Sequence, residues 1–246
     1  MLRTISAVTL ALLALLLIGC SVDEPTSPPA VPAPADGQFD LDKACGNAPG
    51  AKVLPPNARP HGRSYAEWTT AWWKWLLSIP YYENPGLDTD GSFVALNQTG
   101  KVWFLAPNYG GGQVDVRHAT IPTGTMLFID VAGFVGSPTI GDPSDPDALR
   151  AVLKDAVDGI SDIVFEVDGR PLRNIGDYRI RTPLFTLTFP PDNVFGVEPG
   201  SYYPSAAEGY FVMLAPLSRG EHTIHIFADL GSGFGTSEVT FHLTVE

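Results

Sequence analysis

Two histidines near the C-terminus, His225 and His242, are the first residues whose type and spacing suggest chemistry. Each lies in a short run of alternating apolar and polar residues, which is typical of a β-strand. If the two runs form a hairpin that turns around Gly233, the expected register sets His225 opposite His242 on the outer face. Two imidazoles on one face bind a transition metal when a third ligand joins them. The alternative is a pair of solvated surface histidines.

Acidic residues before Gly91 offer a different kind of metal site. Asp88 and Asp90 are two residues apart, as at the start of a calcium loop. Counting from Asp88, position twelve is Thr99 rather than the bidentate Glu of an EF-hand, and no flanking helices are predicted. Calcium in a sandwich loop stays possible, and no other cofactor is expected. The alternative role of these carboxylates, and of a second acidic group, is to cap turns and a helix start: Asp142, Asp145 and Asp147.

Familiar catalytic motifs are missing from the sequence, which has no H-E-x-x-H, C-x-x-C, G-x-S-x-G, S-x-x-K or Walker loop. A glycoside hydrolase needs two carboxylic acids across a cleft. Five acids are available for such a pair and nothing ranks them: Glu166, Asp168, Glu198, Glu208 and Glu221. Arg179 and Arg181 share one strand face and are suited to binding a carboxylate. The absence of these motifs disfavours an enzyme but does not exclude one.

Cys20 follows a hydrophobic leader. Arg3 precedes sixteen uncharged residues that are mostly Leu and Ala, and residues 17–20 (LIGC) fit a bacterial lipobox. A run this short predicts a signal peptide over residues 1–19 rather than a membrane span. Acyl chains such as palmitate on Cys20 would anchor the protein, and Ser21 favours the outer membrane over the inner membrane. The alternative is an ordinary signal peptide with an incidental cysteine, and Cys45 has no intrachain partner once Cys20 is acylated.

Composition and charge set the domain organisation. Residues 20–40 are rich in proline and predict an extended tether, which leaves 41–246 as one large domain. The 246 residues include 15 basic and 27 acidic side chains, a net charge of −12, which disfavours a nucleic-acid partner. Two cysteines exclude a disulfide-rich scaffold and a zinc site with several thiolates.

Four of the five tryptophans lie in one predicted helix. Ser64 and Glu67 form a capping box at its start, and Pro80 ends it. Trp68, Trp72 and Trp75 fall on one apolar stripe, so we expect them to pack in the core. Trp73 lies off that stripe and is a candidate for stacking on a sugar ring. Exposed tyrosines in a later run extend this candidate ligand site: Tyr202 and Tyr203.

The rest of the chain has the two-residue period of strands. One helix that begins with Asp145-Pro146 interrupts them. Because strands and helices do not alternate regularly, we expect a mainly β fold, an antiparallel and jelly-roll-like β-sandwich. The expected strands are 93–97, 102–107, 114–121, 126–134, 163–167, 184–189, 210–214, 222–228 and 239–245.

Five segments together resemble a family of uncharacterised exported bacterial proteins: YAEW…WWKW…SIP (65–80), VWFLA (102–106), IPTG (121–124), DNVFG (192–196) and PLSRGEHTIH (216–225). The resemblance covers about residues 64 to 246 and implies a β-sandwich with a Trp-rich helix, but no activity. Relatives carry a cysteine pair near residues 90 and 119. This chain has Ser92 and Ala119 there, so the resemblance implies that a disulfide has been lost.

We therefore expect a lipid-anchored protein of the bacterial cell envelope, attached to the membrane through Cys20. Its domain would bind a glycan or an envelope protein, or serve as a structural spacer. The alternative function is a polysaccharide hydrolase or lyase acting outside the membrane. A deep cleft with converging acids or histidines would favour the enzyme, and a flat face with exposed aromatic rings would favour the binding module.

Overall fold

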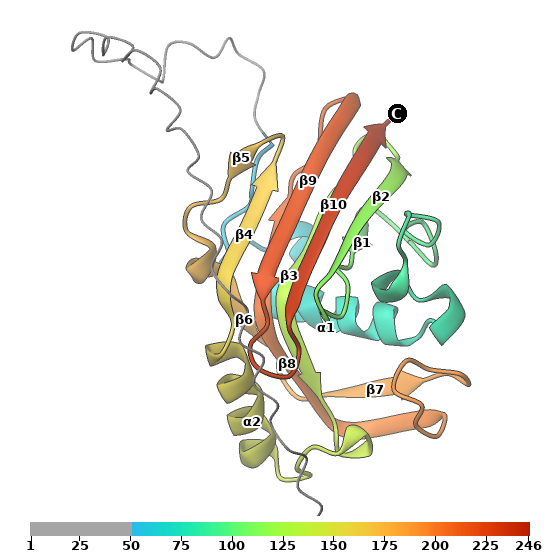
Figure 1. Cartoon of the computed structure of the whole chain (residues 1–246), viewed down its shortest axis with the longest axis vertical. Coiled ribbons are helices and arrows are strands. Elements are labelled where there is room, and N and C mark those ends of the chain that lie inside the picture. The colour runs from blue at the N-terminus through green and yellow to red at the C-terminus, as the bar shows by residue number, and fades with distance from the viewer. Residues whose placement is uncertain (1–50) are drawn as a thin grey trace, which may run out of the picture. The chain divides into compact units, whose positions relative to one another are not determined.

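The computed structural model describes residues 51–246, so the predicted signal peptide, tether, Cys20 and Cys45 lie outside the described residues. Two α-helices, five short 3-10 helices and ten strands make up this part of the chain; Figure 1 shows how the α-helices and strands are arranged. The helices are α1 (Tyr65–Leu77) and α2 (Pro146–Asp158). The strands are β1 (Val102–Leu105), β2 (Gln113–Ile121), β3 (Met126–Gly136), β4 (Ser161–Val167), β5 (Arg170–Pro171), β6 (Arg179–Arg181), β7 (Phe185–Phe189), β8 (Gly200–Leu214), β9 (Gly220–Asp229) and β10 (Thr236–Val245).

The strands form two five-stranded sheets, and the predicted mainly β fold is confirmed. One sheet has the order β1-β3-β8-β6, with β7 also paired to β8, and the other has the order β2-β10-β9-β4-β5. Figure 1 shows β9, β10 and β2 running side by side in one layer. Most pairs are antiparallel, but β1 runs parallel to β3 and β2 runs parallel to β10. The sheets are therefore mixed rather than purely antiparallel, because β1 and β2 join different sheets instead of forming a hairpin with each other.

The Trp-rich helix α1 packs against the first sheet. Its predicted capping box is present: the Ser64 side chain accepts from the Glu67 amide, and the Glu67 carboxylate accepts from the Ser64 amide. The rings of Tyr65 and Phe128 lie 5.6 Å apart, as do those of Trp72 and Phe211. Such edge-to-face contacts add to the free energy of burying large aromatic side chains. The helix is thus a core element, as its apolar spacing predicts.

The last hairpin has a different register from the expected one. His225 pairs with Thr240 and His242 pairs with Thr223, a shift of two residues. The shift arises because the connecting loop closes with the Leu230 amide donating to the Gly235 carbonyl, which centres the turn before Gly233. A two-residue shift keeps every side chain on its face. The inward residues are therefore as predicted, and all are fully buried: Ile224, Ile226, Phe241 and Leu243.

Two other predicted elements have clear outcomes. The inserted helix is α2, with Asp145 as its N-cap accepting from the Ala148 amide and Pro146 at the first position. The expected strand at 93–97 is wrong, because these residues form turns. Within residues 51–246, no helix has both the length and the apolar character needed to cross a membrane.

Candidate ligand-binding site

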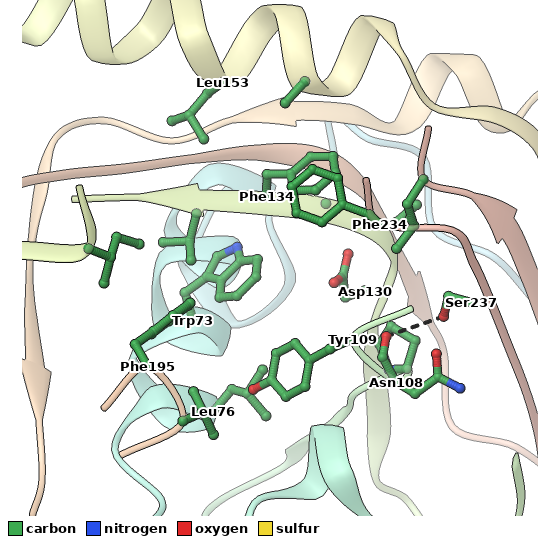
Figure 2. Close-up of a pocket in the computed structure, with 18 of the residues that line it drawn as sticks. Trp73, Leu76, Asn108, Tyr109, Asp130, Phe134, Leu153, Phe195, Phe234 and Ser237 are labelled. Atoms are coloured by element: carbon green, nitrogen blue, oxygen red, sulfur yellow. Dashed lines mark hydrogen bonds between the residues drawn. The ribbon is translucent and has the colours of Figure 1, made fainter. Parts of the chain in front are cut away.

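A cavity of about 570 Å³ lies between α1, β3 and α2 (Figure 2). Loop residues at 107–109, 194–195 and 230–234, and Ser237 at the start of β10, also line it. Its lining is mostly apolar and includes seven aromatic residues: Trp72, Trp73, Tyr81, Tyr109, Phe134, Phe195 and Phe234. Pockets for small molecules typically have volumes of about 300–1,000 Å³ and apolar walls with a few polar groups. The cavity has the size and lining of such a pocket.

Exposed apolar side chains gather around this cavity. The part of the chain that the structure describes has ten large hydrophobic residues that are substantially exposed, and six of them line the cavity: Tyr81, Leu87, Tyr109, Val152, Phe195 and Phe234. Single exposed apolar residues are normal, whereas a cluster around a concave site marks a binding surface. Six of the ten most exposed large apolar residues in the described part of the chain therefore lie where a ligand would enter.

Asp130 brings a carboxyl group into the apolar wall. It lies in β3, where the pairing with β8 shifts register between Asp130 and Ala132, so that Val131 is an extra residue in the strand. Such a bulge redirects neighbouring side chains. A Cβ atom at Gly133 would lie 3.2 Å from Oδ1 of Asp130, so the glycine leaves space for the carboxyl group. Figure 2 shows this carboxyl group among the lining residues, between Trp73 and Ser237.

The Asp130 carboxyl group has no partner in the described residues. Only 4% of the residue is exposed, and its Oδ1 atom is buried without a hydrogen bond. Burial alone raises the pKa of Asp130 well above its ordinary value, because no positive charge compensates for lost hydration. Buried polar atoms in folded proteins nearly always have hydrogen-bond partners, and exceptions are frequent at functional sites. Asp130 is the polar centre of the cavity.

Trp73 supplies a second unpartnered polar atom to the same wall. The other three indoles of α1 donate to backbone carbonyl groups at 3.0–3.1 Å, but the buried Nε1 of Trp73 has no acceptor. A buried N–H group without an acceptor costs about 1–3 kcal/mol. A ligand oxygen in the cavity is one way to recover that free energy.

Hydrogen bonds beside the cavity hold Tyr109 in place. Its hydroxyl donates to Oδ1 of Asn84 at 3.0 Å. Desolvation of this hydroxyl group, together with the nearby Asp130 carboxyl group, raises the pKa of Tyr109. Arg117 ties the two adjoining backbone segments together, because its Nη1 donates to the carbonyls of Pro85 and Ala106. The Tyr109 side of the cavity is thus built before any ligand binds.

Arg117 is itself fully buried and ion-paired. Its Nη2 atom lies 3.2 Å from Oδ2 of Asp115, and the side chains are 0% and 2% exposed. The Asp115 carboxylate also accepts from Asn108 at 2.9 Å, and Asn108 lines the cavity. Burial lowers the pKa of Arg117, and the Asp115 charge opposes that shift. The guanidinium group of Arg117 therefore pairs with Asp115 and holds neighbouring backbone segments, and it does not line the cavity.

The predicted aromatic ligand residues have different surroundings from those expected. Trp73 is only 4% exposed, so its predicted exposure is wrong, although it lines the cavity. Tyr202 is half-buried and its hydroxyl donates to the Glu198 carbonyl, whereas Tyr203 is 66% exposed. Neither tyrosine lines the cavity. The three residues therefore do not form one flat platform.

The residues of the predicted calcium loop form bends and turns that accept hydrogen bonds from their own backbone. Both carboxylate oxygens of Asp88 accept backbone amides, from Asp90, Gly91 and Phe93. Asp90 accepts the amide and hydroxyl of Ser92. These bonds hold the pKa of Asp90 below its ordinary value. Across residues 51–246, no three His, Cys, Asp or Glu side chains gather closely enough to hold a metal ion.

The predicted histidine pair is replaced by another pair. His242 stacks on His118 of the neighbouring strand β2, with ring centroids 5.1 Å apart. His225 lies instead between two carboxylates, 3.2 Å from Glu238 and 4.0 Å from Glu166. The structure thus does not set His225 opposite His242, because the β9–β10 register is shifted by two residues from the expected one.

Ser218, His222 and Asp168 have the distances of a nucleophile, a base and an orienting acid. The Ser218 hydroxyl lies 3.2 Å from Nε2 of His222, and Nδ1 of His222 lies 2.8 Å from Asp168. The Ser218 carbonyl oxygen competes for the same Nε2 at 3.0 Å. These residues line neither the cavity around Asp130 nor a second depression beside α1. The arrangement connects the turn before β9 to the end of β4.

Other predicted acids and arginines pair with one another. Arg179 and Arg181 both bind Glu208 of the adjacent strand, at 2.7 Å and 2.9 Å. The predicted carboxylate partner of this arginine face is therefore in the chain itself. The second depression, lined by Arg63, Lys101 and residues of α1, is more basic than the main cavity.

Comparisons with known proteins assign no family. No family model matches the chain, and no curated protein matches it. Among solved structures, amebosin is similar at 13% identity and a TM-score of 0.21, over 60% of this chain and all of that one. PbICP-C, solved in complex with falcipain-2, has 12% identity and a TM-score of 0.25 with the same coverage. Similarity this low says nothing about fold or function.

Proposed function

We propose that this protein binds a small, mainly apolar molecule in the cavity around Asp130. The observation that carries the proposal is an unpartnered carboxyl group, 96% buried, in an apolar cavity of about 570 Å³. A structure gains nothing from an unpaired buried carboxyl group alone, since desolvation costs free energy that a ligand contact can recover. The cluster of exposed apolar residues at the cavity supports the same function.

We also propose that binding takes place at the bacterial cell envelope, with the domain attached to the outer membrane through acylated Cys20. The lipobox and the proline-rich segment after it support this location. A glycan or protein partner has less support. Of the three aromatic residues predicted to bind it, Tyr203 alone is mostly exposed.

Hydrolysis is the second candidate function, and the geometry of Ser218, His222 and Asp168 is the observation in its favour. The competing carbonyl of Ser218 and the separation from both cavities favour a structural role for these residues. We therefore place small-molecule binding first.

A fluorescent probe tests the leading proposal. The mature chain (20–246) with Cys20→Ser, purified without detergent, is titrated with the neutral apolar dye Nile red. Ala156→Phe adds a ring to α2 at the cavity wall, and Ala151→Phe adds the same ring to an exposed position of α2 that does not line the cavity. We expect Ala156→Phe to weaken binding about tenfold, equivalent to about 1.4 kcal/mol, and Ala151→Phe to leave it unchanged. Equal effects of the two variants, or no binding to the unsubstituted chain, would overturn the proposal.

A further inference from the structure

The cavity wall carries acidic groups without any basic side chain. Two of its lining residues, Asp130 and Asp142, are acids, and no Lys, Arg or His lines it. Asp142 already accepts the Ser137 amide at 2.9 Å. Asp130 accepts nothing within the described residues and has no ion-pair partner there. A ligand with a carboxylate or phosphate would find no counter-charge among the side chains of this wall.

Aromatic rings surround the unpaired carboxyl group. Trp73, Tyr109, Phe134 and Phe234 line the same cavity, and Figure 2 shows Asp130 among them. The Phe134 and Phe234 rings pack 4.8 Å apart. The faces of such rings carry partial negative charge and attract organic cations, most strongly where water is excluded. Both features of the wall, the carboxyl group and the rings, favour a positive group.

Resting on the proposed function, we infer that the ligand is an organic amine with an apolar body, whose ammonium group pairs with the Asp130 carboxylate. The ammonium group of the ligand supplies the positive charge that no side chain of the cavity wall offers to Asp130. The apolar body of the ligand packs against the aromatic rings. The net charge of −12 raises the local concentration of cations around the protein.

Three probes of nearly equal shape separate this ligand class from the others. They are 1-naphthylmethylamine, 1-naphthylmethanol and 1-naphthoate, which carry a positive, a neutral and a negative group on the same ring system. Binding to the mature chain with Cys20→Ser is measured by calorimetry at pH 7. We expect the amine to bind at least tenfold more tightly than the alcohol, and the naphthoate to bind most weakly.

Asp130→Asn keeps the shape of the side chain and cannot ionise. We expect it to remove the preference for the amine while changing the affinity for the alcohol less than threefold, which also shows that the cavity remains folded. Asp155→Asn, an equal charge change on the exposed side of α2, serves as the matched control and should leave the preference intact.

The outcomes separate the two proposals. If the alcohol binds as tightly as the amine in a manner sensitive to Ala156→Phe, the amine inference is overturned while the binding function stands. Persistence of the amine preference in Asp130→Asn overturns the inference as well. If none of the three probes binds while Nile red still does, the amine inference is overturned and the binding function stands; if Nile red does not bind either, both proposals fail.

Discussion

Gly86 lies directly against the ring of Tyr109: a Cβ atom at residue 86 would be 2.5 Å from Cε2 and 2.7 Å from Cζ of the tyrosine. Contacts this short force the ring to move. Tyr109 lines the cavity and is held by its hydrogen bond to Asn84. The size of one residue in a neighbouring turn therefore sets the position of a cavity wall.

Gly86→Ala tests this relationship. We expect it to lower the free energy of unfolding by about 1–3 kcal/mol through overpacking, and to weaken Nile red binding because the Tyr109 ring is displaced. Chemical denaturation and dye titration measure the two effects. Gly176→Ala is the control, since a Cβ atom there meets nothing within 4 Å. Equal stability of the two variants would contradict the packing seen here.

Asp130→Asn should change how stability depends on pH. The pKa of Asp130 is raised by burial, so above pH ~4 the folded chain keeps a proton that the unfolded chain releases. Its contribution to stability is complete below the unfolded pKa and is lost as pH rises towards the folded pKa, by up to about 1.4 kcal/mol per pH unit. Relative to Asp130→Asn, the unsubstituted chain should therefore lose stability from pH 4 upward. Urea unfolding between pH 4 and 8 measures this difference, and parallel curves would show that Asp130 is not buried without a partner.

Arg117→Met should be among the most destabilising single changes in the described part of the chain. It leaves Asp115 buried without its counter-charge and removes the donor shared by the Pro85 and Ala106 carbonyls. We expect a loss of about 3–5 kcal/mol. Arg59→Met, at an exposed pair with Glu67, should cost less than about 1 kcal/mol. Thermal and chemical unfolding compare the two, and a small effect at Arg117 would mean that the buried ion pair is dispensable.

Ser218→Ala and His222→Ala separate a structural role from hydrolysis. We expect His222→Ala to lower the free energy of unfolding by about 1–2 kcal/mol, because it removes the hydrogen bond to Asp168. Ser218→Ala should leave the hydrolysis of p-nitrophenyl acetate unchanged. Hydrolysis that disappears in Ser218→Ala would instead support the enzyme.

Cys20→Ser should release the full-length chain from the membrane. In a Gram-negative host fed labelled palmitate, we expect label on the unsubstituted chain and on Cys45→Ser, but none on Cys20→Ser. Membrane fractionation follows the same samples. Label that persists without Cys20 would contradict the lipobox prediction.

The predictable parts of this protein are those set by local physics. The capping box at Ser64, the helix at Asp145 and the inward face of the last hairpin follow from hydrogen bonding and periodicity within one segment. The signal peptide and lipid anchor also depend on local sequence alone, and they stay predictions.

The cavity depends on contacts between segments far apart in the chain. Residues 126–134 are predicted as a strand, and Asp130 is the one acid in this otherwise apolar run. An acid in a buried strand is the signal that could have identified Asp130 as a site residue. The pairing of β3 with β8 creates the bulge beside Asp130. It also brings Gly209 against Gly133, so that a Cβ atom added to Gly209 would lie 2.4 Å from the Cα of Gly133.

By itself, then, the sequence determined the mainly β fold, the Trp-rich helix and the buried face of the last hairpin, because these depend on neighbours within a few residues. Tertiary structure alone decided that the indole N–H of Trp73 is buried without an acceptor, that His242 stacks on His118, and that β1 and β2 each run parallel to the neighbouring strand. Sheet order and register bring together residues more than a hundred positions apart, such as His118 and His242, and no local spacing encodes which of them will meet.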